Sequence, residues 1–321
     1  MNKYLTITID VEPDCTTNWT YSSPIRFTGV SEGIARRLQP LFNKYDIAPT
    51  YLINNVVLEN EESAFTLKNL EGKYELGTHL HPEFIEPQKS EFDYAGKKGE
   101  ANCCFYPPDI EFQKLKSITE LFINKIGYPP ESFRAGRFSA GNNTIASLEK
   151  LGYKVDTSVT PHVIWNDKTR EHPVDYRKAP EQPYFISSKS LIERNFAGAI
   201  LEAPVTISMR KASILKELKR TRFGLRDKIR AERPLWLIPV FSTLPEFIEL
   251  TKEFEKRYYS SANIFFNMMF HNVEVMPGLS PYTRTEQDCQ AYLQQLEKFF
   301  AYCSSNQIQS ITLKDAYKIY R

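Results

Sequence analysis

The stretch ELGTHLHPEF, residues 75–84, has the pattern of an apolar strand that ends in two histidines, His79 and His81. Side chains alternate along a β-strand, so both imidazoles project to the same face. On this spacing alone, the pair is either a set of metal ligands or two histidines that share a strand. Residues elsewhere in the chain decide between these two interpretations.

The segments around this stretch alternate between strand and helix patterns, which predicts an α/β fold. Helices are expected at 31–46, with Ser31 as N-cap and a break at Pro40, and at 109–127, 142–152 and 285–303. Such alternation predicts right-handed crossovers and a parallel sheet, open or closed into a barrel. The predicted strands are Leu5–Val11, Pro49–Ile53, Tyr74–Leu80, Ser132–Gly136, Tyr153–Val159, Ala199–Thr206, Asn263–Phe270 and Ile308–Leu313.

The chain is predicted to form a single domain, 1–321, because no Gly/Ser-rich linker or internal repeat divides it. Two insertions, at about 82–108 and 160–198, are longer than ordinary connections between secondary structure elements. Loops of that length in a compact domain usually bind substrate or form a lid, and we expect these to do so.

The composition argues against a protein that binds nucleic acid or spans a membrane. Lys and Arg number 41 against 39 Asp and Glu, and the formal charge of +2 is too small to hold nucleic acid. No apolar run approaches the ~20 residues of a membrane span, and the N-terminal segment lacks the apolar core of a secretory signal. The five cysteines form no C-x-x-C pair and are expected to be reduced thiols. We therefore expect a cytoplasmic protein.

One segment, residues 216–234, carries eight Lys and Arg against three acids. It is either a solvated helix face or a patch that attracts anionic lipid head groups or diphosphates. The second reading would allow peripheral contact with the cytoplasmic face of a membrane, and no deeper contact is expected.

Polar side chains lie where several predicted strands end, which is where α/β folds place their chemistry. The first strand ends in Asp10-Val11-Glu12, whose two carboxylates share a face. Arg134 and His271 end two later strands. Two histidines and a carboxylate are a common ligand set for Zn²⁺ or Fe²⁺, with Co²⁺ or Mn²⁺ as alternatives. The acids of the first strand therefore favour the metal-site interpretation of the histidine pair.

A pair of carboxylates beside a metal allows a division of roles. One carboxylate can bind the metal, while the other accepts a proton from water whose pKa the metal lowers to about 7. The pattern leaves open whether the ligand is Glu12, Asp10 or Asp14. Motifs of other enzyme classes are missing, because the chain has no H-E-x-x-H, Walker loop, G-x-G-x-x-G or G-x-S-x-G.

Five stretches in order resemble the polysaccharide deacetylase (NodB-homology) family. They are TITIDVE (6–12), APTYLI (48–53), ELGTHLHPE (75–83), FRAGRFSAGNNTIASLEKLGYKVDTS (133–158) and MMFHNVEVMPG (268–278). The resemblance implies a distorted (β/α)7 barrel with a metal at its C-terminal rim. This chain departs from the family in three places: Asp10-Val11-Glu12 replaces an adjacent Asp pair, the spacing between His79 and His81 is short, and the stretch after Arg134 differs.

The resemblance also implies a role for each residue of the candidate site. The metal would be Zn²⁺ first, with Co²⁺, Mn²⁺, Fe²⁺ or Ni²⁺ as alternatives. The implied roles are metal ligation by Glu12, His79 and His81, general base catalysis by Asp10 with Arg134 orienting it, and general acid catalysis by His271 with Asp156 tuning it.

The activity implied by the resemblance is hydrolysis of an N-acyl group, acetyl in the simplest case, from an amino sugar. The DVE and GTHLHPE patterns are similar to those of proteins of O-antigen and related surface-glycan assembly. A cytoplasmic enzyme of that kind would act on a sugar nucleotide or a lipid-diphosphate-linked glycan. Two alternatives stay open: a metal-dependent amidohydrolase for a small cyclic amide or imide, and an inactive glycan-binding relative. The sequence does not specify the sugar, the acyl group or the oligomeric state.

Overall fold

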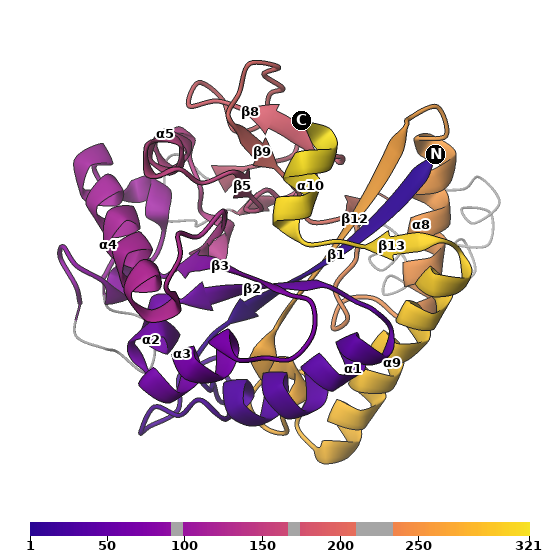
Figure 1. Cartoon of the computed structure of the whole chain (residues 1–321), viewed down its shortest axis with the longest axis horizontal. Helices are drawn as coiled ribbons and strands as arrows, with labels where there is room; N and C mark the ends of the chain where they lie inside the picture. Colours follow the sequence, from indigo (N-terminus) through magenta and orange to yellow (C-terminus); the bar gives the residue numbers. More distant parts are fainter. Residues whose placement is uncertain (91–98, 166–173, 210–233) are drawn as a thin grey trace, which may run out of the picture.

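The computed structural model describes residues 1–90, 99–165, 174–209 and 234–321. Within these ranges the main sheet has the strand order β12-β1-β2-β3-β4-β5-β9-β8, with β13 against β1 (Figure 1). Neighbouring strands from β12 to β9 are parallel, whereas β8 is antiparallel to β9. The strands are β1 (Asn2–Val11), β2 (Pro49–Asn54), β3 (Glu75–Leu80), β4 (Ser132–Ala135), β5 (Val155–Asp156), β8 (Tyr184–Ile186), β9 (Ile200–Glu202), β12 (Asn263–His271) and β13 (Ile308–Ser310).

The sheet curls, so that the segment after β9 meets β12 and nearly closes a barrel. The backbone N–H of Thr206 donates to the carbonyl of Asn267 on β12 at 3.0 Å. Leu237 bridges the same seam, because its N–H donates to the Thr206 carbonyl and its own carbonyl accepts from Met269. These bonds do not extend the regular ladder, so the barrel closes irregularly on this side.

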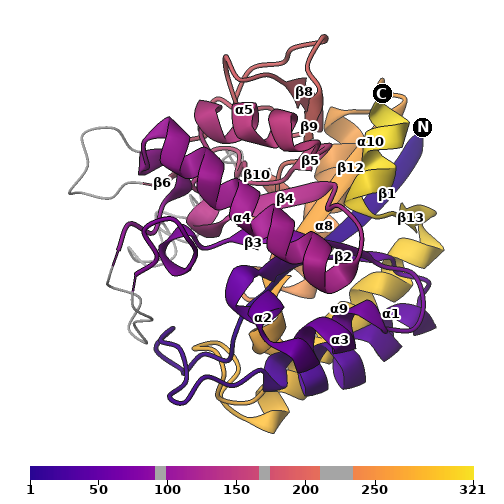
Figure 2. The same cartoon turned by 60° about the vertical axis from the view of Figure 1, so that its left-hand side comes forward.

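Helices surround the sheet on its outer face, as Figures 1 and 2 show from two directions. Helix α4 packs against α5 and β3, α8 packs against α9, and α10 lies beside β5. The helical segments are a π-helical segment (Gly29–Leu38), α1 (Gln39–Lys44), α2 (Asn55–Glu59), α3 (Glu61–Lys68), α4 (Pro108–Ile126), α5 (Asn142–Leu151), α8 (Leu244–Arg257), α9 (Glu286–Ser305) and α10 (Leu313–Tyr320).

Side-chain alternation along the strands separates an apolar outer face from a polar inner one. On β1, Leu5, Ile7 and Ile9 belong to the main hydrophobic core, together with core side chains of the surrounding helices. Thr8 and Asp10 have the opposite parity and hydrogen-bond Arg134 inside the curled sheet. The inside of the barrel is therefore polar near its C-terminal rim, where the candidate site lies.

Most of the predicted elements are present, including all eight predicted strands, of which β1, β2 and β12 are longer than predicted and the others shorter. Gly127 and Gly152 end α4 and α5 in the left-handed conformation, with φ of 99° and 86°. Pro40 stands where the π-helical segment gives way to α1. The prediction of Ser31 as N-cap is wrong, because the helical segment begins at Gly29.

Several elements were not predicted. They include the helices α2, α3, α8 and α10, and four short strands in two small sheets: β6 (Ile164–Trp165), β7 (Val174–Asp175), β10 (Ile207–Ser208) and β11 (Leu235–Trp236). All five cysteines are free thiols, as predicted. Among the described residues, no helix is both long and apolar enough to cross a membrane. Most of the basic segment 216–234 lies outside the described residues.

Candidate metal centre and active site

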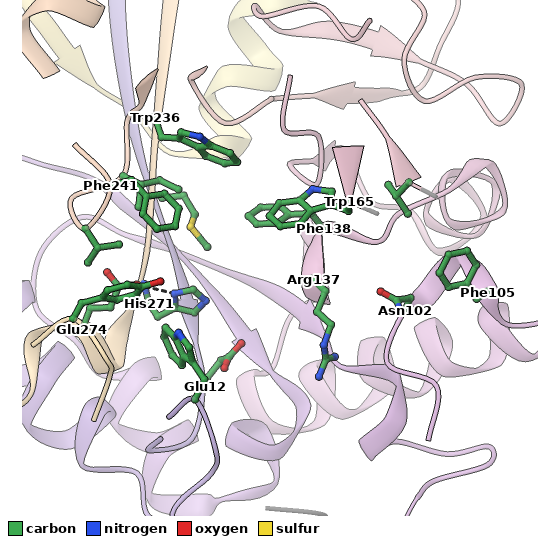
Figure 3. Close-up of a pocket in the computed structure, with 16 residues that line it drawn as sticks. Glu12, Asn102, Phe105, Arg137, Phe138, Trp165, Trp236, Phe241, His271 and Glu274 are labelled. Carbon is green, nitrogen blue, oxygen red and sulfur yellow. Dashed lines mark hydrogen bonds and ion pairs between the residues drawn. The ribbon is translucent and has the colours of Figure 1, made fainter. Parts of the chain in front are cut away.

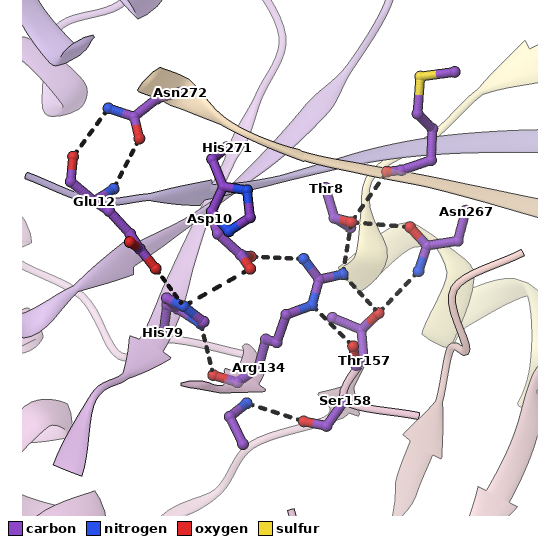
Figure 4. Close-up of polar contacts among 12 residues, drawn as sticks. Thr8, Asp10, Glu12, His79, Arg134, Thr157, Ser158, Asn267, His271 and Asn272 are labelled. Atoms are coloured by element: carbon purple, nitrogen blue, oxygen red, sulfur yellow. Dashed lines mark hydrogen bonds and ion pairs between the residues drawn. The ribbon is translucent and has the colours of Figure 1, made fainter. Parts of the chain in front are cut away.

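Four parallel strands bring the predicted site residues to one rim of the barrel. In the sheet register, Asp10 on β1 is paired with His271 on β12. On the other side of β1, His79 of β3 is paired with Arg134 of β4. Figure 4 shows these side chains converging from neighbouring strands, as the strand-end argument predicted.

Glu12, His79 and His81 form a buried cluster in which one ligand atom of each residue lies within 4.8 Å of the others. Oε1 of Glu12 lies 3.3 Å from Nε2 of His79 and 3.0 Å from Nε2 of His81. The two Nε2 atoms are 3.1 Å apart. Ligands at the bond lengths of a tetrahedral zinc site stand roughly 3.3 Å from one another. The donor set and its spacing therefore fit a divalent cation.

The ring of His79 is oriented by the backbone of the neighbouring strand. Its Nδ1 lies 3.1 Å from the carbonyl oxygen of Arg134, which can only accept a hydrogen bond. Nδ1 therefore carries the proton, and Nε2 turns its lone pair toward Glu12 and His81. Metal-binding histidines are typically held in this way by a hydrogen bond from the other ring nitrogen.

His81 faces a buried carboxylate on its second ring nitrogen. Nδ1 of His81 has no hydrogen-bond partner and lies 3.7 Å from Oε1 of Glu83. Glu83 is fully buried and accepts a hydrogen bond from Nη1 of Arg137 at 2.8 Å. Burial alone would lower the pKa of His81, but the carboxylates of Glu12 and Glu83 outweigh it and raise the pKa to about 9.

Asp10 is held by Arg134 at the inner side of the cluster. Nη1 of Arg134 donates to Oδ1 of Asp10 at 2.6 Å, and the other carboxylate oxygen lies 3.7 Å from Nε2 of His79. Burial favours the neutral acid, but Arg134, together with His79 and His271, outweighs burial and lowers the pKa of Asp10. Arg134 itself is fully buried and also donates to Thr8, at 2.7 Å, and to the carbonyl of Thr157, at 2.9 Å.

The backbone of Glu12 is fixed by Asn272, the residue after His271. The N–H of Glu12 donates to Oδ1 of Asn272 at 2.8 Å, and Nδ2 of Asn272 donates to the Glu12 carbonyl at 3.1 Å. This two-point contact joins the end of β1 to the end of β12. The side chain of Glu12 is thereby directed toward the two histidines, and these histidines outweigh burial and hold the pKa of Glu12 well below its usual range.

Asp14, the third acid near the first strand, has a different role. Its carboxylate accepts from the backbone N–H groups of Thr28, at 2.9 Å, and Gly29, at 2.8 Å, and so caps the π-helical segment. A Cβ atom at Gly29 would lie 2.7 Å from Nδ2 of Asn272, so this glycine allows the segment to pack against the site. Among the three candidate acids, Glu12 is the one that clusters with both histidines.

His271 projects over the rim and is paired with Glu274, three residues later. Nδ1 of His271 donates to Oε1 of Glu274 at 2.9 Å, while Tyr292 donates to the other carboxylate oxygen at 2.9 Å. Burial lowers the pKa of His271, but the bond to Glu274 and the nearby Glu12 and Asp10 carboxylates raise it to about 9. The imidazole is therefore protonated at neutral pH, with Nε2–H available.

Asp156 does not occupy the place that the family resemblance implied beside His271. It is fully buried, accepts from the Ser158 hydroxyl at 2.7 Å, and is paired in register with Glu202 of β9. Burial, together with the facing Asp156, raises the pKa of Glu202 well above its usual range. The carboxylate that tunes His271 is Glu274, which the sequence reasoning missed although it lies only three residues away.

A pocket of about 640 Å³ opens beside this cluster, and Glu12 and His271 form part of its wall (Figure 3). Phe138 and Trp165 lie stacked on one side, facing Trp236 and Phe241 on the other. The lining residues come from many separate segments, so sequence spacing carried little sign of the pocket. They are Glu12, Trp19, Asn102, Phe105, Arg137, Phe138, Trp165, Val174, Trp236, Ile238, Val240, Phe241, Met269, His271, Glu274 and Tyr282.

The chain is similar in structure to several solved proteins, while no protein-family model and no curated protein matches it. A candidate glycoside hydrolase or deacetylase from Parabacteroides distasonis is 12% identical, with a TM-score of 0.63 over 100% of this chain and 71% of that one. A candidate polysaccharide deacetylase from Mycobacterium smegmatis is 13% identical, with a TM-score of 0.55 over 99% of this chain and 90% of that one. The Puue allantoinase is 13% identical, with a TM-score of 0.53 over 98% of this chain and 89% of that one.

At this level of identity the similarities establish the fold. The chain has a curled, mainly parallel sheet surrounded by helices, which is the distorted barrel of the polysaccharide deacetylase type. The predicted distorted (β/α)7 barrel is thus confirmed. The roles of the individual residues are taken up below as a proposal.

Proposed function

We propose that this protein is a metal-dependent hydrolase that removes an N-acyl group from an amino sugar of a surface-polysaccharide precursor. One observation carries the proposal: the rim that holds the buried Glu12–His79–His81 cluster also carries a carboxylate paired with arginine and a protonated histidine, which are partners in the sheet register. This arrangement offers a metal site, a base and an acid within one rim. The similarity in fold to candidate deacetylases supports the same reaction class.

The proposed metal ligands are Glu12, His79 and His81, and the proposed ion is Zn²⁺, with Co²⁺, Mn²⁺, Fe²⁺ or Ni²⁺ as alternatives. Such an ion would polarise the acyl carbonyl and lower the pKa of water at the site. Two nitrogen donors and one carboxylate leave coordination positions for water and substrate. Asp10 stands farther from the histidine nitrogens than Glu12 does, so it remains free to exchange a proton.

Asp10 is proposed as the general base. Its carboxylate stays ionised because Arg134 lowers its pKa, and its second oxygen faces the cluster from 3.7 Å. It can therefore accept the proton of the attacking water. Arg134 orients Asp10 rather than touching the substrate, because its other donors are taken by Thr8 and Thr157.

His271 is proposed as the general acid. The leaving nitrogen of an amide must be protonated before it departs, and Nε2–H of His271 is available for this transfer. Glu274 keeps the imidazole protonated and in one orientation through Nδ1. We propose Glu274, in place of Asp156, as the positioning residue for His271.

The test combines metal analysis with an assay. The purified protein should contain a divalent metal and release acetate from N-acetylated amino sugars, such as N-acetylglucosamine and its nucleotide-linked form. His79→Ala should lose the metal and the activity, whereas Asp10→Asn should keep the metal and lose rate. His162→Ala is the control, because His162 pairs with Glu181 away from the cluster. Absence of metal, or full activity of Asp10→Asn, would refute the proposal.

A cyclic amide is the second candidate substrate, because the fold is also similar to that of an allantoinase, with a TM-score of 0.53. The same base, acid and metal site would open a cyclic ureide or imide. A comparison of kcat/KM on N-acetyl sugars and on cyclic ureides separates the two, because only the preferred class should show turnover that disappears in Asp10→Asn. The proposed cytoplasmic setting, where glycan precursors are built, favours the amino sugar.

A further inference from the structure

The pocket beside the metal cluster differs chemically from a site built for sugar hydroxyl groups. The chain has three tryptophans, and all of them, Trp19, Trp165 and Trp236, line this one pocket. The fluorescence of every tryptophan in the protein should therefore change when an apolar ligand is buried in this pocket.

Ring contacts run without a break around the pocket wall. Phe138 stacks on Trp165 at 5.3 Å, and Trp165 contacts Trp236 at 6.4 Å. The chain of contacts continues from Trp236 to Phe241 at 5.8 Å and then reaches His271. Those last steps run from Phe241 to Tyr282 at 6.1 Å, from Tyr282 to Trp19 at 5.9 Å, and from Trp19 to His271 at 5.1 Å.

The floor of the pocket is aliphatic. Met269 lies two residues before His271 on β12, so it faces the same side of the sheet, deeper in the barrel. Met269 and Ile238 are buried and pack into one hydrophobic cluster with Val205 and Ile207. Val240 is half-buried and packs against the same cluster.

Several polar groups on the wall are already engaged within the protein. Nε1 of Trp165 donates to Thr160 at 2.9 Å, and Nδ2 of Asn102 donates to Glu100 at 3.0 Å. Both carboxylate oxygens of Glu274 accept hydrogen bonds, as described above. A sugar placed deep in this pocket would leave hydroxyl groups unpaired, which costs free energy for each one buried.

We infer that the deep part of the pocket binds the acyl group of the substrate, and that this group is an aliphatic chain of about six to ten carbons rather than acetyl. The inference rests on the proposed N-acyl hydrolysis. An acyl chain starts at the carbonyl that the cluster would bind, and Glu12 lies in the pocket wall. It is also a terminal group, so it can end against this aliphatic floor.

The size of the pocket agrees with this assignment. One sugar ring bearing an eight-carbon acyl chain has roughly twenty non-hydrogen atoms, a ligand size that pockets of several hundred Å³ accommodate. The pocket measures about 640 Å³. An acetyl group would leave most of the aliphatic floor without a contact.

Equilibrium binding tests the inference without relying on turnover. N-acetylglucosamine and N-octanoylglucosamine are titrated into the Asp10→Asn variant, in which the substrate stays intact, and tryptophan fluorescence is followed. A fully buried methylene is worth about fourfold in affinity, so six added methylenes should tighten binding at least about tenfold overall. Equal affinity for the two ligands would overturn the inference. Octyl N-acetylglucosaminide, which carries its octyl chain on the sugar instead of on the acyl group, is titrated as a control. Tighter binding for this compound alone would also overturn the inference.

The second test measures kcat/KM of the wild-type protein on glucosamine substrates whose N-acyl chains have two to twelve carbons. The ratio of kcat/KM for octanoyl over acetyl should exceed one, and Val240→Asn should lower that ratio because it places an amide on the apolar wall. Val240→Trp should shift the preferred length to shorter chains. Ile123→Asn, an exposed position on α4, is the matched control and should leave the ratio unchanged.

The two proposals fail in different ways. Loss of metal binding and of all hydrolysis would refute the proposed function, while the fluorescence titration would still report on the pocket. Acetyl release with a ratio that does not rise with chain length would refute only the assignment of the pocket.

Discussion

Arg134 donates from Nη1 to Oδ1 of Asp10 across 2.6 Å, and neither side chain has more than a few per cent of its surface exposed. Two charges buried together in this way stabilise each other, and each is costly if its partner is lost. Arg134 is in turn oriented by Thr8 and Thr157. The position of the proposed base is therefore set by a hydrogen-bond network inside the barrel rather than by a loop.

Replacing Arg134 by methionine should destabilise the protein by about 3–5 kcal/mol, because the Asp10 carboxylate would remain buried without a partner. Urea unfolding at pH 7 measures this change. The double variant Arg134→Met/Asp10→Asn should recover part of the loss, because it removes both charges. If the double variant is less stable than the single one, the two residues do not depend on each other as the contact indicates.

Replacing Glu274 by glutamine should lower the pKa of His271 from about 9 toward the ordinary value near 6.5. The proposed general acid, His271, must be protonated to act, so the alkaline limb of the rate profile should move to lower pH. NMR titration of the His271 imidazole gives the same shift independently of activity. Glu286→Gln, an exposed carboxylate paired with Arg37, is the control. An unchanged alkaline limb would exclude Glu274 as the tuning residue.

Replacing Glu83 by glutamine should weaken metal binding by about 10–100-fold, because carboxylates behind ligating histidines support their orientation and basicity. Glu83 stands 3.7 Å behind Nδ1 of His81 and is fully buried. Competition with a chelator of known affinity measures the effect. The matched control is Glu59→Gln, since Glu59 pairs with Lys89 at the surface. Equal metal affinity in the two variants would contradict the prediction.

Glu111 on α4 should make the stability fall as pH rises. Burial raises its pKa from 4.5 to about 7, and its carboxyl group contacts the Thr144 hydroxyl. The folded state thus holds a proton that the unfolded state releases between these values, so the contribution of Glu111 to stability is highest below pH 4.5 and declines through pH 7. Glu111→Gln should remove this decline, worth on the order of 2 kcal/mol. Thermal unfolding at pH 5 and pH 8 measures it, with Glu120→Gln as the exposed control.

The strands and their chemistry could be predicted because buried parallel strands leave a strong pattern. Side-chain alternation predicts that Asp10 shares a face with Glu12, and that His79 shares a face with His81. The sheet register then brings the two strand ends together with Arg134. The short helices α2 and α3 were missed because they are only 5 and 8 residues long, too short to show a clear helical period.

Contacts between distant segments could not be predicted in the same way. Asp14 looked equivalent to Glu12 as a ligand, and only its bonds to Thr28 and Gly29 identify it as a helix cap. Those bonds also explain why the helical segment begins before Ser31. The assignment of Asp156 came from the family resemblance, whereas the choice of Glu274 depends on the turn after β12, which has no clear signal in the residue pattern.

The close packing at Gly29 connects the helical segment to the candidate metal centre through two contacts, one with Asn272 and one from Asn272 to Glu12. A methyl group at this position would meet Nδ2 of Asn272 at 2.7 Å, and that amide holds the carbonyl of Glu12. Pushing the amide aside would release the end of β1 and let Glu12, a proposed metal ligand, move away from His79 and His81. A substitution as small as Gly29→Ala is therefore expected to weaken metal binding at the proposed site, although it changes none of the proposed ligands, base or acid.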